Sequence, residues 1–265
     1  MTASPAPLPR SRASTIPALI AHRGHTARYP ENTLIGLEAA AACGASYVEV
    51  DVQLSADGMP ILFHDETLDR LCGVPGTIHQ YDSKSLARLR AGEPARFGTR
   101  FADEPLAPLA AVGDLLRRHP GLTAFIEAKG IAIEHFGAQA VLQAITGTLR
   151  EVAAQYVLIA FSFDFLQLAR ALTPQPLGAV IEHWDERGKA PLQSLQPEYL
   201  FCDHNGLPAT GPLTTNADCR IAVYEIADGA AALALAARGA GMIETFSICE
   251  MHRFMQQQAA ADGSD

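Results

Sequence analysis

The sequence predicts an α/β fold in the form of a (β/α)8 barrel, and three observations support this fold class. The chain has 265 residues, a common length for one such barrel. Hydrophobic residues make up 48% of it and charged residues 18%, as in chains that bury a full core. From residue 18 onward short β-rich runs alternate with helical patterns, which is typical of parallel βαβ units. An open doubly wound sheet fits the same alternation, but no G-x-G-x-x-G motif follows the first strand.

Nine runs are predicted strands, and eight of them can close a barrel if the third lies outside it. Their ranges are 18–22, 46–52, 60–63, 122–128, 157–161, 177–182, 198–202, 221–225 and 241–246. Helical patterns are predicted over 32–43, 108–118, 137–154, 164–172, 189–195, 229–239 and 249–259. The first helix has clear signals at both ends, because Asn32 or Thr33 can cap its first turn and Gly44 lies where a helix would stop.

The chain is predicted to form a single barrel domain over 18–265, preceded by an arm. Residues 1–17 are rich in Pro, Ser and Ala without a continuous apolar run, which favours a flexible arm over a signal peptide. Residues 66–107 contain many Gly and Pro residues, and Asp82 and Ser83 begin one short helix there. A connection of this length predicts a small insertion, after the second barrel strand, that covers the barrel mouth.

Charge and cysteine content limit the partners and the location. The formal charge of −9 without a basic tract argues against nucleic acid as a partner, and the apolar runs are too short for stable membrane insertion. Five widely spaced cysteines predict reduced, mostly buried thiols and a cytoplasmic protein: Cys43, Cys72, Cys202, Cys219 and Cys249. The oligomeric state is not indicated by the sequence.

Two carboxylates in an apolar strand are the sharpest sign of chemistry. Glu49 and Asp51 are two residues apart, so they lie on one face of the strand. They face solvent or the inside of the barrel, and inside it they would need a cation or hydrogen-bond donors. Glu127 and Lys129 repeat this spacing at another strand end. Three carboxylates with open positions suit Mg²⁺ or Ca²⁺ better than zinc.

Two histidines at strand ends are candidate acid–base groups. His22 and His64 each follow a predicted strand beside a charged neighbour, at the end of the barrel where active sites lie. Arg23 offers a forked donor for phosphate. The other histidines are expected to be core or surface residues, with His25 and His204 as candidates for exceptions because they fall near strand ends.

Together these motifs resemble the glycerophosphodiester phosphodiesterase family. The motifs that carry the resemblance are His22-Arg23-Gly24, Pro30-Glu31-Asn32-Thr33, Glu49-Val50-Asp51-Val52, Asp57-Gly58, His64-Asp65, Leu68-Asp69-Arg70, Glu127-Ala128-Lys129 and Phe161-Ser162-Phe163. Order and spacing match the family over residues 18–129, and Phe161-Ser162-Phe163 after the fourth barrel strand is also similar. As a set these motifs are highly specific.

The resemblance implies a TIM barrel that hydrolyses a phosphodiester to an alcohol and sn-glycerol 3-phosphate with a divalent cation. It implies that Glu49, Asp51 and Glu127 bind the metal. It also implies that His22 and His64 are the catalytic pair, while Arg23 and Lys129 hold the phosphate. The substrate is then a small glycerophosphodiester whose headgroup the sequence does not specify.

The C-terminal part departs from the family pattern. Tyr224 and Glu225 stand where the family usually shows Trp and Thr, and Glu244 interrupts the usual G-I-I-T-D ending. The resemblance therefore implies the phosphate chemistry but does not define the pocket for the glycerol or alcohol. Four aromatic residues are candidates to line it, although core packing is the simpler interpretation of each: Phe163, Trp184, Tyr224 and Phe246.

Two other functions fit a barrel with these residues. A phospholipase D-like enzyme of the sphingomyelinase D type would act on phospholipid headgroups, but a signal segment and a disulfide pattern are lacking in the sequence. A non-catalytic barrel that binds glycerophosphodiesters would not need both histidines and all three carboxylates.

Overall fold

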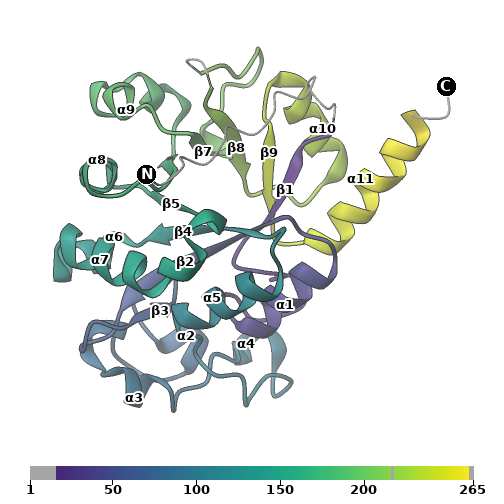
Figure 1. Ribbon diagram of the computed structural model, residues 1–265. Coiled ribbons are helices and arrows are strands. Elements are labelled where there is room, and N and C mark those ends of the chain that lie inside the picture. The colour runs from purple at the N-terminus through teal and green to yellow at the C-terminus, as the bar shows by residue number, and fades with distance from the viewer. Residues whose placement is uncertain (1–15, 216–217, 263–265) are drawn as a thin grey trace.

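The computed structural model describes residues 16–215 and 218–262. These residues form a closed barrel of parallel strands (Figure 1). Within those residues eight parallel strands form the ring: β1 (Ala18–Ala21), β2 (Tyr47–Leu54), β4 (Thr123–Ala128), β5 (Tyr156–Ala160), β6 (Leu177–Ile181), β7 (Tyr199–Asp203), β8 (Arg220–Tyr224) and β9 (Met242–Thr245). The first strand, β1, pairs with both β2 and β9, so the sheet closes on itself. The predicted (β/α)8 barrel is confirmed, and the open sheet is excluded.

The extra strand lies outside the ring, as predicted. Strand β3 (Pro60–Leu62) pairs antiparallel with the far end of β2, where Val52 lies opposite Leu62. The chain therefore runs back along β2 from the level of Leu54 to that of Asp51, whose carbonyl accepts a hydrogen bond from the Phe63 N–H. This path places the residues after β3 near the carboxyl ends of the barrel strands.

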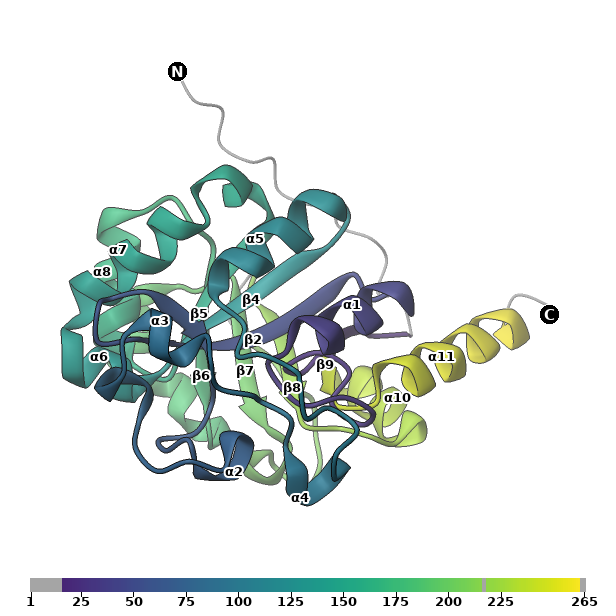
Figure 2. The same cartoon turned by 90° about the horizontal axis from the view of Figure 1, so that it is seen from below.

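Helices surround the barrel and run between its strands (Figure 2). Those outside the insertion are α1 (Leu34–Ala42), α5 (Leu109–Arg118), α6 (Gly130–Phe136), α7 (Ala138–Thr148), α8 (Phe163–Leu172), α9 (Ala190–Leu195), α10 (Gly229–Arg238) and α11 (Ile248–Asp262). Three short 3₁₀ helices accompany them: η2 (Arg150–Gln155), η3 (Trp184–Gly188) and η4 (His204–Gly206). Thr33 caps α1, because its side chain accepts a hydrogen bond from the Gly36 N–H.

The prediction of one helix over 137–154 is wrong at its C-terminal end, and α6 was not predicted. Gly137 separates α6 from α7 because its backbone has a φ of +83°, which ends the first helix. Gly147 and Thr148 are poor helix formers, and α7 stops there. A 3₁₀ helix, η2, follows instead of the expected last turns.

The insertion after β2 is a small folded unit with its own core. It contains α2 (Asp69–Cys72), η1 (Ile78–Gln80), α3 (Ser83–Leu86) and α4 (Pro94–Phe97), in the lower part of Figure 1. Asp82 caps α3 by accepting a hydrogen bond from the Ser85 N–H. The core of this unit consists of buried side chains from β3 and the insertion: Ile61, Phe63, Leu68, Leu71, Ile78, Leu86, Ala91 and Leu106.

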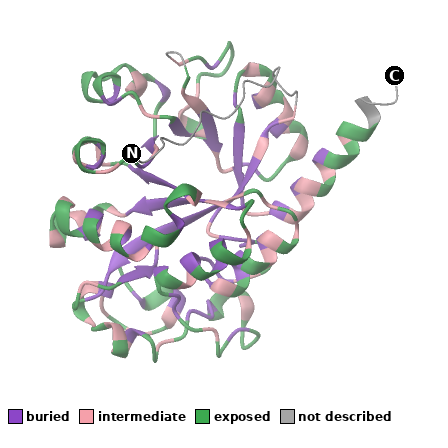
Figure 3. Ribbon diagram, viewed as in Figure 1, coloured by how far each residue is buried: buried purple, intermediate pink, exposed green. Residues whose placement is uncertain are grey.

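Two apolar layers, one on each face of the barrel wall, bury the strands (Figure 3). Val48, Val50 and Val52 of β2 belong to the outer layer, which packs against the helices. The inner layer fills the barrel with alternate residues such as Ile20, Phe125, Val157, Val180, Phe201, Ala222 and Met242. The valines of β2 therefore face outward, and the residues between them face the barrel interior.

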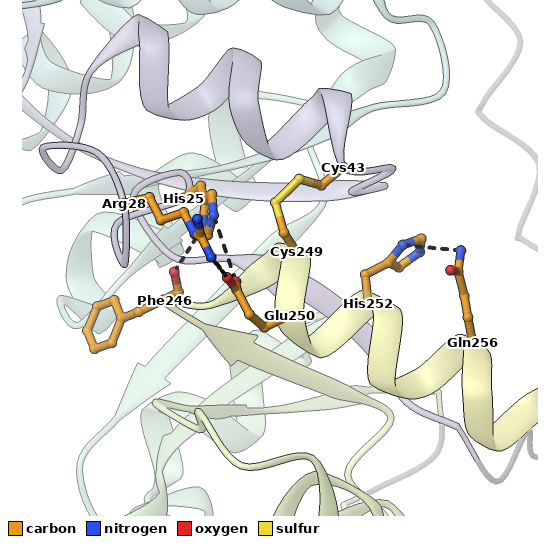
Figure 4. Close-up of a disulfide and its surroundings, with 8 residues drawn as sticks. All are labelled: His25, Arg28, Cys43, Phe246, Cys249, Glu250, His252 and Gln256. Carbon is orange, nitrogen blue, oxygen red and sulfur yellow. Dashed lines mark hydrogen bonds and ion pairs between the residues drawn. A yellow bond between two sulfur atoms is a disulfide. The ribbon is translucent and has the colours of Figure 1, made fainter.

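A disulfide joins the first helical unit to the last. Cys43, directly after α1, is bonded to Cys249 in the first turn of α11, across 206 residues of sequence (Figure 4). The prediction of reduced thiols is therefore wrong for these two cysteines, because the fold brings their Cα atoms to 5.3 Å, a distance that suits a disulfide. Cys72, Cys202 and Cys219 are free thiols.

No helix in the described part of the chain combines the length and apolar character that a membrane-spanning segment needs. The predicted arm, residues 1–17, lies outside the described residues apart from Ile16 and Pro17.

Candidate active site

A layer of charged side chains lies above the apolar filling of the barrel. Ile20 and Phe125 belong to the inner layer. Side chains alternate along a strand, so every second residue counted from these two also points inward. Two residues beyond these apolar positions, at the carboxyl ends of the strands, come His22 and Glu127. The register pairs Asp51 with Glu127 and Ile20 with Glu244, which brings strands from both halves of the chain to one site.

Three carboxylates from β2 and β4 converge in this layer. Glu49, Asp51 and Glu127 each offer one oxygen, and these oxygens lie within 4.8 Å of one another. All three residues are buried, with exposed fractions of 2%, 1% and 8%. The predicted metal ligands therefore lie together inside the barrel, where the fold excludes the alternative that Glu49 and Asp51 face solvent.

Asp51 is the best neutralised of the three carboxylates. Its Oδ2 lies 2.9 Å from Arg23 Nε, and its Oδ1 lies 3.2 Å from Lys129 Nζ. Asn32 donates from Nδ2 to Oδ2 at 2.8 Å and accepts from the Asp51 N–H at 3.1 Å. Burial alone would raise the pKa of Asp51, but the two cations and the amide hold it far below its usual value.

Glu49 and Glu127 are less well neutralised. The Arg23 N–H donates to Glu49 Oε2 at 3.2 Å, and Lys129 Nζ donates to Glu127 Oε1 at 2.7 Å. Burial and the neighbouring Asp51 carboxylate raise the pKa of both glutamates. Within residues 16–215 and 218–262, no group forms a hydrogen bond with Glu49 Oε1, although it is buried.

The backbone after β1 is shaped to present Arg23. Arg23 has a φ of +54° and Gly24 a φ of +90°, so the chain turns sharply and directs the Arg23 N–H toward Glu49. A Cβ on Gly24 would lie 2.8 Å from the backbone carbon of Gly36, closer than atoms can pack. The close approach of this turn to α1 therefore requires a glycine at position 24.

His22 is buried between carboxylates from three strands. Its Nε2 lies 3.7 Å from Glu49 Oε2, its Nδ1 lies 3.2 Å from Glu225 Oε1, and its ring stacks on Phe246 at 4.8 Å. Burial lowers the affinity of the ring for a proton, but Glu244 and Glu225 outweigh it and raise the pKa of His22. The contact with Glu225 and the stacking on Phe246 therefore orient the ring.

His64 occupies the opposite kind of environment, at the open mouth of the barrel. Its side chain is 35% exposed, and its Nδ1 lies 2.9 Å from Asp65 Oδ1. Arg70 of α2 donates to both oxygens of Asp65, at 2.6 and 2.7 Å, and also pairs with Glu31. Gln53 donates to the Asp65 carbonyl at 2.6 Å. The insertion and β2 therefore hold the segment that presents His64.

Five polar residues that support the site were not predicted as site residues: Glu31, Asn32, Gln53, Asp65 and Arg70. Four of them belong to the family motifs quoted above, and that membership is the sequence signal that could have identified their roles. Gln53 carries a weaker signal, since it continues the inward alternation of Glu49 and Asp51 along β2.

Two further carboxylates come from the C-terminal strands. Glu225 follows β8 and is the neighbour of His22, while Glu244 lies within β9 with an exposed fraction of 3%. Burial and the Glu127 carboxylate raise the pKa of Glu244 to about 7, against the opposing effect of His22. One ligand atom each of His22, Glu49 and Glu244 lie within 4.8 Å of one another.

The remaining candidates are mostly structural. Phe163 and Trp184 pack in the outer core, and Tyr224 donates its hydroxyl proton to the Ile181 carbonyl at 3.0 Å. His25 is buried against Phe246 and Glu250 (Figure 4). Of the four aromatic candidates, Phe246 alone stacks on a site residue in the described part of the chain.

The residues present fit a hard divalent cation. Three convergent carboxylates supply the oxygen ligands that Mg²⁺ and Ca²⁺ prefer, and a buried carboxylate oxygen without a donor remains on Glu49. Four buried carboxylates face two largely buried cations, Arg23 and Lys129, so the site lacks positive charge. A divalent cation would supply it.

Comparison with known families and proteins shows extensive similarity. Residues 22–217 match the model of the glycerophosphoryl diester phosphodiesterase family. Glycerophosphodiester phosphodiesterase 1 of Mus musculus is 38% identical over 125 residues, which cover 47% of this chain and 36% of the mouse protein. Glycerophosphodiester phosphodiesterase of Caldanaerobacter subterraneus is 38% identical over 98 residues, 37% of this chain and 40% of that protein. The matched part of these relatives is thus well under half of their length.

Solved structures match over nearly the whole barrel. A phosphodiesterase of Oleispira antarctica, in complex with the product sn-glycerol-3-phosphate, has a TM-score of 0.78 and 25% identity, covering 93% of this chain and 97% of that one. A glycerophosphodiester phosphodiesterase of Agrobacterium tumefaciens has a TM-score of 0.73 at 24% identity, covering 90% and 100%.

Proposed function

Because this chain belongs to the glycerophosphoryl diester phosphodiesterase family, we propose that it hydrolyses glycerophosphodiesters to an alcohol and sn-glycerol 3-phosphate with a divalent cation. One observation carries the proposal: three buried carboxylates, two basic side chains and a buried histidine meet at the carboxyl end of the barrel. The glycerol 3-phosphate bound to the Oleispira enzyme supports the same product for this chain.

Glu49, Asp51 and Glu127 would hold the cation, either Mg²⁺ or Ca²⁺. When bound, such an ion polarises phosphoryl oxygens and stabilises the charge that develops on them. The carboxylates themselves orient Arg23 and Lys129, which are ion-paired with Asp51 in the absence of substrate.

Arg23 and Lys129 would bind the phosphate. A guanidinium offers a fork of donors that suits two phosphate oxygens, and the lysine ammonium adds a point charge. Both side chains come from strand ends and are held by Asp51, so their charges are fixed before substrate arrives. Charges fixed in this way stabilise the transition state without reorganisation.

His22 and His64 would transfer the protons. One deprotonates the attacking hydroxyl, and the other protonates the leaving alkoxide. The attacking hydroxyl belongs to water or to the 2-position of the glycerol, and the second route passes through a cyclic phosphate. The contacts with Glu225 and Asp65 orient the two rings.

Release of glycerol 3-phosphate from a panel of glycerophosphodiesters, with and without chelator, tests the function. We expect release from at least one member of the panel, loss of turnover in excess EDTA, and recovery with added Mg²⁺ or Ca²⁺. Full activity in excess EDTA would contradict the metal role. Binding of every diester without turnover would support a non-catalytic barrel instead.

The same panel should include a lysophospholipid to test the phospholipase D-like alternative. The disulfide between Cys43 and Cys249 removes one argument against that alternative. The cytoplasmic location was predicted partly from the expectation of reduced cysteines, and the disulfide removes this reason. We propose a cytoplasmic location on the remaining one, the composition of the arm.

A further inference from the structure

We propose that His22, Glu49 and Glu244 form a second cation site, which takes a transition metal such as Zn²⁺. One ligand atom from each residue lies within 4.8 Å of the other two, and all three residues are buried. The site shares Glu49 with the three-carboxylate site and adds an imidazole and a carboxylate from β1 and β9, which continue the ring from β2 on the side away from β4. Its residues come from β2, β9 and the end of β1.

A buried carboxylate oxygen points to a missing ligand. Glu244 is 3% exposed, and no group in the described ranges, 16–215 and 218–262, forms a hydrogen bond with its Oε1. Glu49 Oε1 is buried and lacks a partner in the same way. Buried carboxylate oxygens normally accept hydrogen bonds or bind a cation. Two such oxygens on the two carboxylates of one cluster therefore favour a bound cation between them.

The orientation of His22 is the one that a metal-binding imidazole has. Metal-binding histidines usually present their second ring nitrogen to a carboxylate or carbonyl, which fixes the ring and its tautomer. Here Nδ1 lies 3.2 Å from Glu225 Oε1, and Nε2 lies on the side of Glu49, 3.7 Å from Oε2. Glu225 therefore leaves Nε2 as the nitrogen available to a metal.

The two sites differ in the metals they favour. The Glu49, Asp51 and Glu127 set offers oxygen alone and suits Mg²⁺ or Ca²⁺, whereas an imidazole with two carboxylates suits Zn²⁺ or a similar transition metal. The nearest cations, Arg23 and Lys129, are ion-paired with Asp51 rather than with Glu244. With a cation in the first site, Glu244 would still have no ion pair with a described Lys or Arg.

Zn²⁺ in the second site would occupy the nitrogen that His22 needs for proton transfer. We therefore expect Zn²⁺ to inhibit the Mg²⁺-activated enzyme. This inhibition rests on the proposed function of His22, whereas Zn²⁺ binding itself does not depend on turnover.

Zn²⁺ binding by the whole chain, freed of metal and then saturated with Mg²⁺, tests the site directly. Competition with a chromophoric zinc chelator should reveal a Zn²⁺ equivalent that excess Mg²⁺ does not displace. Glu244→Gln should weaken this equivalent by at least ~10-fold, because it removes a ligand oxygen. Glu225→Gln should weaken it by ~10-fold through the loss of the carboxylate beside Nδ1.

Glu151→Gln is the matched control, since it removes the same charge from an exposed side chain at the start of η2. It should bind Zn²⁺ as tightly as the unaltered chain. Circular dichroism establishes that each variant is folded, and Glu225→Gln provides the test if Glu244→Gln does not fold.

Two results would overturn the second site: displacement of all Zn²⁺ by Mg²⁺, or equal Zn²⁺ affinity in the unaltered chain and both folded variants. Failure of the proposed function looks different. In that case no diester in the panel is hydrolysed, while the Zn²⁺ equivalent and its loss in Glu244→Gln remain.

Discussion

The two sides of the barrel mouth balance their charges in different ways. On the side of β2 and β4, Asp51 forms ion pairs with Arg23 and Lys129 and accepts a hydrogen bond from the side-chain amide of Asn32. On the side of β8 and β9, Glu244 has no ion pair with any described Lys or Arg, and Glu225 pairs with His22. The first side is preorganised by its own cations, whereas the second side depends on His22 and on bound ions for compensation.

Replacing the histidines should have the largest effect. We expect His22→Ala and His64→Ala each to lower kcat by at least ~10²-fold, because each removes a proton-transfer group. Steady-state kinetics on the best diester measures this. His204→Ala is the control, since His204 also follows a barrel strand but contacts Asp203 and the Tyr224 carbonyl. Near-normal turnover in either site variant, with the fold intact, would contradict the acid–base assignment.

Asn32→Ala should weaken the binding of Mg²⁺ by Glu49, Asp51 and Glu127. The variant loses both hydrogen bonds to Asp51, and loss of such a support typically costs ~10- to 100-fold in metal affinity. Titration of activity with Mg²⁺ measures the change. Asn205→Ala, which removes an exposed amide on η4, should leave the Mg²⁺ titration unchanged. An unaltered titration in Asn32→Ala would show that Asp51 does not need this support.

Glu225→Gln should have a smaller effect, on turnover rather than on substrate binding. Glutamine keeps the shape but loses the charge beside Nδ1, so His22 is oriented less firmly, and we expect kcat to fall ~10-fold with KM unchanged. Glu182→Gln, an exposed carboxylate after β6, controls for the loss of charge. A change in KM alone would indicate that Glu225 contacts substrate instead.

Removal of the disulfide should affect stability alone. A Cys43→Ser, Cys249→Ser double variant should lose about 2–4 kcal/mol of stability, because the bond closes a long loop in the unfolded chain. Thermal unfolding of both proteins measures the loss, and reductant should lower the Tm of the unaltered chain only. Equal Tm values without reductant would show that the bond contributes nothing.

Sequence patterns predicted the barrel because each signal was local. Alternation of apolar residues marked the strands, and the spacing of Glu49 and Asp51 places both on one face of β2. Which face of β2 is inside could not be decided locally, because a barrel strand is covered by apolar contacts on both faces. The structure resolves this because Val48, Val50 and Val52 pack in the outer layer against the helices, which leaves Glu49 and Asp51 on the inner face.

Contacts between distant segments could not be predicted. The pairing of Cys43 with Cys249 depends on closure of the ring, which brings the ends of the chain together. Glu225 and Glu244 deviate from the family pattern, so their motifs gave no indication of a role. Their positions beside His22 follow only from the arrangement of β8, β9 and β1.

The disulfide has a consequence for the chain after proteolysis. The barrel is closed by hydrogen bonds between β1 and β9 and is also closed covalently between Cys43 and Cys249. A single cut at any peptide bond from 44 to 248, for example in an exposed loop of the insertion, would leave two fragments joined by sulfur. The nicked protein should therefore migrate as one molecule in non-reducing electrophoresis and separate into two bands after reduction.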